Sequence, residues 1–130
     1  MRLAKHPLGS ARLVFAMASR RNKAAKKRGI GVMGVRAVAA GSLTNKIDRS
    51  VELRSREQRD FEKAEMFRAL AAETGTTAAK LAHRYALAMD GVDTVVLGVK
   101  NRTELLECIE SEAQSMPGPE LLQRIDDSVA

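Results

Sequence analysis

The chain has few of the residues that usually carry chemistry or large packing contacts. Its 130 residues include no tryptophan, one tyrosine, three phenylalanines, one cysteine and two histidines. Cys108 cannot form an internal disulfide and has no metal-ligand spacing with His6 or His83, so the sequence predicts no metal site and a reducing compartment, the cytoplasm. The scarcity of aromatic side chains, beside abundant alanine, predicts closely packed helices.

Long apolar runs are also missing. No stretch approaches the roughly 20 uninterrupted apolar residues that a membrane-spanning helix needs, so we expect a soluble protein with no membrane partner. The hydrophobic fraction of 45% is enough for a folded core, and the length fits one domain.

Acidic residues are absent from the start of the chain. Residues 1–36 hold 10 Lys/Arg and no Asp/Glu, whereas residues 37–130 hold 12 Lys/Arg and 16 Asp/Glu. Three interpretations fit the basic segment: a nucleic-acid patch, an organelle-targeting presequence, or the exposed face of a helix. We favour the last and expect no nucleic-acid partner, because no aromatic side chains alternate with the bases and no nucleic-acid module is recognisable. We therefore divide the chain into a basic segment with a helix, residues 1–28, and a main part, residues 29–130.

The pattern of apolar residues and breakers predicts a mixed α/β order. A helix over 11–27 ends at Gly29, and residues 30–35 resemble a buried parallel strand. A small-residue loop and an irregular polar stretch to about residue 60 follow, then helices over 61–73 and from about 77 to 89, a second buried strand near 94–97, and helices over 102–112 and 120–129. A strand, a helical crossover and a strand imply a parallel pair, and two strands with unpaired edges indicate part of a larger sheet.

The same patterns predict which side chains face inward. The expected core residues are Phe61, Ala64, Phe67, Leu70, Ala71, Leu81, Ala82, Tyr85, Ala88, Met89, Leu105, Cys108, Ile109, Leu121, Leu122 and Ile125. Tyr85 is expected to keep its hydroxyl at the edge of the core, and His83 is expected at the surface.

The stretch Thr94–Glu104 is the most distinctive turn, since an apolar run breaks at Gly98 and a helix begins at once. Asn101 can cap that helix while Glu104 reaches back to the cap, a capping box that leaves other first-turn N–H groups without partners. Those donors, with Lys100 and Arg102, suit an anion such as a nucleotide phosphate. An ordinary turn with two solvated bases fits the same residues, so both interpretations stay open.

Three blocks in a fixed order carry a resemblance to a known family. Residues 29–44 (GIGVMGVRAVAAGSLT), 67–87 and 94–109 resemble the seventh strand and its loop, the seventh helical crossover, and the eighth strand, turn and helix of the aldo-keto reductases. That family consists of NAD(P)H-dependent oxidoreductases with a (β/α)8 TIM barrel. The resemblance covers about residues 24–128 and implies a partial barrel, with two parallel strands and about five helices.

The resemblance also implies a cofactor site. Arg36, Ala37, Val38, Ala39, Gly41 and Leu43 would contact the pyrophosphate and nicotinamide end of NADP or NAD, and Gly98, Val99, Lys100, Arg102 and Glu107 would surround the adenosine end. Lys100 and Arg102 would be available to a 2′-phosphate. Glu104 occupies a position where many NADP-using members have arginine, which leaves the choice between NADP and NAD open.

What is absent matters equally for function. A complete barrel needs about 250 residues, and none of the catalytic Asp, Tyr, Lys and His of the family can be assigned in this chain. The resemblance therefore implies a truncated or split product without activity of its own. Its expected partner is the missing N-terminal barrel half or another copy bound through strand edges. The alternative is a small non-catalytic interaction module.

Overall fold

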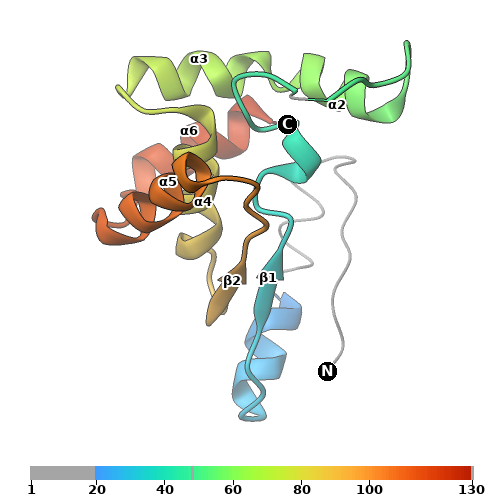
Figure 1. Ribbon diagram of the computed structural model, residues 1–130. Coiled ribbons are helices and arrows are strands. Elements are labelled where there is room, and N and C mark those ends of the chain that lie inside the picture. Colours follow the sequence, from blue (N-terminus) through green and yellow to red (C-terminus); the bar gives the residue numbers. More distant parts are fainter. Residues whose placement is uncertain (1–19, 48, 130) are drawn as a thin grey trace.

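The computed structural model describes residues 20–47 and 49–129 (Figure 1). Residues 20–27 are helical. They are followed by β1 (Met33–Val35), the 3-10 turn η1 (Ala39–Gly41), α2 (Arg56–Lys63), α3 (Glu65–Glu73), α4 (Ala78–Ala88), β2 (Thr94–Val96), α5 (Arg102–Ala113) and α6 (Pro119–Ser128).

The two strands form a parallel pair, as predicted. Met33 pairs with Thr94 and Val35 with Val96, and α2, α3 and α4 lie on the connection between them. Both strands are shorter than predicted. The prediction that both strands are buried is wrong. β1 is only half-buried and Ile30 before it is exposed, while Thr94 and Val96 of β2 are exposed and no element in the described part of the chain covers them.

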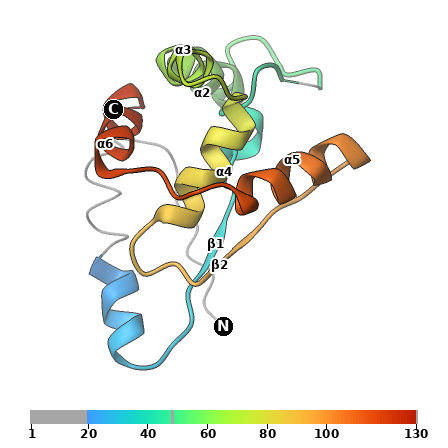
Figure 2. The same ribbon diagram turned by 90° about the vertical axis from the view of Figure 1, so that its left-hand side faces the viewer.

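The core lies where α3, α4 and α6 meet. Phe67, Leu81 and Ile125 are its largest fully buried apolar side chains, and each stabilises the fold by about 1.5–3 kcal/mol through burial. The remaining buried members are mostly alanines, which let the helices approach closely. In Figure 2, α4 runs between α5 on one side and α6 on the other. The predicted alanine-rich helical core is therefore confirmed.

Side-chain caps explain where the helices begin. Thr77 accepts a hydrogen bond from the N–H of Lys80 at the start of α4. Ser55 caps α2 through the N–H of Gln58, and the Gln58 side chain accepts from the N–H of Arg54. The sequence analysis predicted an irregular stretch to about residue 60 and missed this cap. The stretch is wrong from Arg56 on, where α2 begins.

Two further predictions about helices need correction. The predicted helix over residues 61–73 is interrupted at Ala64, whose backbone angles (φ −83°, ψ 14°) separate α2 from α3. The helix predicted over residues 11–27 is confirmed for residues 20–27, while residues 11–19 lie outside the described part. It ends at Gly29, which has a φ of 68°.

The basic helical segment contacts the turn before β2. Asn22 donates to the backbone oxygen of Asp90 at 3.3 Å, and Lys23 forms an ion pair of 2.9 Å with the Asp90 carboxylate. Gly91, with a φ of 78°, is required there because a Cβ atom would lie 2.8 Å from the Cβ of Asn22. No helix in the described part of the chain is long and apolar enough to cross a bilayer.

For three side chains, the structure gives the opposite of the predicted burial. His83 was predicted at the surface but is only 6% exposed. Leu105 and Ile109 were predicted in the core but are 47% and 54% exposed. The reason is that α5 packs on α4 through its other face, which carries Glu107 and Ser111.

Candidate functional site

The predicted cofactor residues of both loops begin at the same edge of the sheet. Val35 is the last residue of β1 and pairs with Val96, the last residue of β2. Residues 36 and 97 therefore leave the sheet side by side, at the carboxyl ends of parallel strands (Figure 1). In α/β proteins this edge is where ligands bind.

The loop after β1 has an unusual backbone. Arg36, Ala39 and Ala40 have positive φ values of 63°, 49° and 58°, and Gly41 follows with 98°. Each left-handed residue other than glycine costs about 1–2 kcal/mol. Hydrogen bonds from the N–H of Ala39 to Arg36 O (2.8 Å) and from the N–H of Gly41 to Val38 O (2.9 Å) hold this conformation.

Residues outside the predicted site brace this loop. The Arg68 guanidinium on α3 donates to Ser42 O at 3.3 Å and lies 3.8 Å from the centre of the Phe61 ring. Burial lowers the pKa of Arg68, and the nearby Glu65 carboxylate partly opposes this. Asn45 accepts from the N–H of Ala78, which ties the far end of the loop to α4. Sequence reasoning missed Arg68 and Asn45, because both contacts join segments far apart in the chain.

The turn after β2 is a capped helix start. Asn101 accepts from the N–H of Glu104 at 3.0 Å, as predicted. The Glu104 carboxylate accepts from the N–H of Lys100 at 2.7 Å. The capping box predicted the N–H of Asn101, the next residue, as this donor. Lys100 and Arg102 are exposed beside it. The Asn101 amide oxygen thus satisfies one first-turn N–H of α5, and the Glu104 carboxylate binds the N–H of the residue before the cap.

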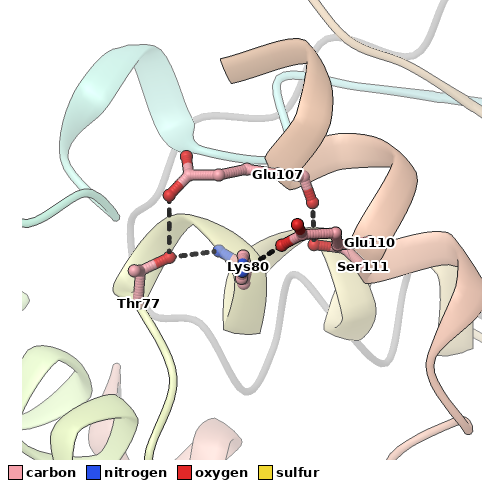
Figure 3. A network of polar contacts seen from close by, with 5 residues as sticks. All are labelled: Thr77, Lys80, Glu107, Glu110 and Ser111. Atoms are coloured by element: carbon pink, nitrogen blue, oxygen red, sulfur yellow. Dashed lines mark hydrogen bonds and ion pairs between the residues drawn. The ribbon is translucent and has the colours of Figure 1, made fainter. Parts of the chain in front are cut away.

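Glu107 points toward α4, as Figure 3 shows. Its carboxylate accepts from the Thr77 hydroxyl at 3.4 Å, and its backbone oxygen accepts from the Ser111 hydroxyl at 2.6 Å. Lys80 and Glu110 form an ion pair beside it. The structure therefore uses Glu107 to join α5 to the N-terminal end of α4, separately from the turn that carries Lys100 and Arg102.

Comparison with protein families decides what kind of protein this is. The model of the aldo/keto reductase family matches residues 16–127. The chain belongs to the aldo/keto reductase family. A comparison with curated proteins gives no match.

Membership confirms the resemblance found in the sequence. The family consists of oxidoreductases that generally use NAD(P)H, and its α/β class agrees with the parallel strands and helices described here. The barrel and the individual cofactor contacts stay predictions.

The remaining reactive groups in the described part show no catalytic arrangement. Burial raises the pKa of the Cys108 thiol, and the carboxylates of Glu107 and Glu104 raise it further, so this thiol is a poor nucleophile. Tyr85 donates to the Asp126 carboxylate, and burial is the main cause of its raised pKa. The described residues contain no group of three His, Cys, Asp or Glu side chains that could hold a metal ion.

Proposed function

We propose that this chain is the dinucleotide-contacting, C-terminal part of an aldo/keto reductase barrel and does not reduce carbonyl compounds by itself. The observation that carries the proposal is the placement of two loops at one sheet edge, after the paired residues Val35 and Val96. In a barrel of this family that edge faces the cofactor. The single cysteine fits a reducing compartment, and we propose the cytoplasm.

The loop after β1 fits the pyrophosphate and nicotinamide end of NAD(P)H. Its residues Ala37, Val38, Ala39 and Gly41 have small or short side chains, which let a phosphate approach the backbone. The positive φ values at Arg36, Ala39 and Ala40 keep the backbone in a strained shape, and such strain concentrates at ligand-binding sites.

The turn after β2 fits the adenosine end. The exposed bases Lys100 and Arg102 stand at the N-terminus of α5, where the helix dipole favours a phosphate. The Glu104 carboxylate shares this position and would repel a 2′-phosphate. We therefore expect little preference for NADPH over NADH.

The chain has no assigned general acid. The family reaction delivers hydride from the nicotinamide to a carbonyl while a tyrosine donates a proton. Tyr85, the only tyrosine, lies on α4 and belongs to neither of the two loops. Its hydroxyl donates to the Asp126 carboxylate. The missing strands would have to supply the catalytic Asp, Tyr, Lys and His, so the partner we propose is an N-terminal barrel half.

Binding and turnover test the two parts of this proposal separately. We expect the purified chain to bind NADH and NADPH measurably by calorimetry and to consume neither with aldehyde or ketone substrates. Arg102→Ala should weaken NADPH binding about fivefold to tenfold through loss of one phosphate contact. Lys63→Ala, which removes an exposed base on α2, is the matched control and should leave binding unchanged.

Each outcome decides one statement. Turnover by the chain alone would overturn the claim that it lacks catalytic machinery. Absence of dinucleotide binding would overturn the assignment of the loops. Mixing the chain with a fragment that contains the first six strand–helix units of a family barrel should restore reductase activity if the chain completes a barrel.

The alternative function is a non-catalytic interaction module. Within residues 20–47 and 49–129, the outer edges of β1 and β2 are unpaired and Val96 is 49% exposed, which favours this function because an unpaired strand edge can accept another strand. Binding of a partner without any dinucleotide affinity would favour this module over the reductase fragment.

A further inference from the structure

Two guanidinium groups bind backbone oxygens of the loop after β1. Arg49 donates to Ala40 O at 3.1 Å, and Arg68 donates to Ser42 O at 3.3 Å. The two bases differ in their settings. Arg49 is exposed and only nine residues further along the chain, whereas Arg68 is half-buried on α3. Arg68 therefore joins the loop to a helix of the core.

The surroundings of Arg68 hold its side chain in place. The central carbon of its guanidinium lies 3.8 Å from the centre of the Phe61 ring on α2, and a cation over an aromatic face is attracted to the ring. A planar guanidinium can stack on a ring and donate in its own plane at the same time, whereas a lysine ammonium has no plane to stack. One side chain thus connects α2, α3 and the loop after β1.

The residue that Arg68 binds lies where the loop closes. Ser42 is 3% exposed and follows Gly41, whose φ is 98°. The N–H groups of Gly41 and Leu43 both donate to Val38 O, at 2.9 Å and 3.2 Å. The Ser42 oxygen and the Leu43 N–H belong to one planar peptide unit and point in opposite directions. A fixed Ser42 oxygen therefore keeps the Leu43 N–H directed toward Val38.

A loop of this shape needs support before a ligand binds. Ala39 and Ala40 have positive φ values of 49° and 58°, which are unfavourable for residues with a Cβ atom. If the loop left this conformation in the free chain, ligand binding would have to order it again, and that ordering would weaken affinity. We infer that Arg68 is a positioning residue for the dinucleotide, because it holds the loop after β1 in its binding conformation and so sets the affinity for the pyrophosphate and nicotinamide end. This inference rests on the proposed function of the loop.

The inference predicts an effect at one end of the dinucleotide only. Arg68 contacts the loop after β1, whereas Asn101 and Glu104 hold the turn after β2. Loss of Arg68 should therefore weaken the binding of NADH, which reaches both loops. It should not change the binding of 2′,5′-ADP, which carries only the adenosine end. A general loss of stability would weaken both ligands together.

Calorimetry with NADH and 2′,5′-ADP measures this difference in the full chain. Arg68→Met removes the donor and the charge, and should weaken NADH binding about tenfold while 2′,5′-ADP binding stays within about twofold of wild type. Arg68→Lys keeps the charge and a donor but loses the planar stacking, so its NADH affinity should lie between those of wild type and Arg68→Met. Arg56→Met removes an exposed guanidinium of α2 that pairs with Asp60 on the same helix, and this matched control should change neither affinity.

Hydrogen–deuterium exchange tests the loop without any ligand. Arg68→Met should speed the exchange of the Gly41 and Leu43 amides about tenfold and leave the amides of α4 unchanged. Loop exchange at the wild-type rate, unchanged NADH affinity, or equal weakening of both ligands would each overturn the inference. A wild-type chain that binds neither ligand would instead overturn the proposed function and with it the dinucleotide role of Arg68, while the exchange rates would still show whether Arg68 holds the loop.

Discussion

Protonation of His83 should make the fold sensitive to mild acid. This side chain lies on α4 and is 6% exposed, and its buried Nδ1 atom has no hydrogen-bond partner among the residues that the structure describes. Burial lowers the pKa of His83 below its usual 6.5, and the Glu107 carboxylate only partly opposes this. The folded protein therefore holds the imidazole neutral over a range in which the unfolded chain protonates it.

The sign of the effect follows from linkage. Above about pH 6.5 both states hold a neutral imidazole, so this group does not change the free energy of unfolding with pH. As the pH falls below that value, the unfolded state binds a proton first, and unfolding becomes easier by up to about 1.4 kcal/mol per pH unit. The loss ends once the pH falls below the folded-state pKa.

Urea unfolding followed by circular dichroism at pH 7.5, 6.5 and 5.5 measures this slope. His83→Leu should flatten it and should not reduce stability at pH 7.5, because it also removes a buried polar atom without a partner. His6→Gln removes the only other histidine and serves as the control. Equal slopes for wild type and His83→Leu between pH 7.5 and 5.5 would refute the argument.

Three further stability predictions use the same unfolding assay. Ala40→Gly should stabilise the fold by about 1 kcal/mol, because Ala40 is left-handed (φ 58°, ψ 30°), and an unchanged midpoint would show that the loop is not strained there. Leu81→Ala should destabilise by about 2–5 kcal/mol, since Leu81 is 0% exposed, whereas Leu53→Ala at an exposed site should cost almost nothing. Thr77→Ala should cost about 0.5–2 kcal/mol through loss of the α4 cap, and Thr77→Ser should recover most of it if the hydroxyl is the cause.

Local signals in the sequence predicted much of the fold. The order of strands and helices, the cap at Asn101 and the helix end at Gly29 each depend on neighbouring residues, so they could be read directly. The parallel pairing also followed, because a strand, a helical crossover and a strand allow few other arrangements. Of the missed elements, α2 had a readable signal in Ser55 and Gln58.

The order of three sequence blocks determined the family, which no single turn could do. Gly98 and its flanking bases fit an ordinary helix start as well as an anion site, whereas the match over residues 16–127 shows membership of the aldo/keto reductase family. The cofactor residues within that match stay predictions that the binding experiments address.

Only the tertiary structure decided which face of α5 is buried and that His83 lies inside. The apolar periodicity of α5 predicted Leu105 and Ile109 inside, yet the helix packs on α4 through Glu107 and Ser111 and leaves those two side chains outside. His83 is buried for the same reason, since its surroundings come from a helix more than twenty residues away. Periodicity fixes which residues share a face, but the identity of the neighbouring element determines whether that face meets protein or water.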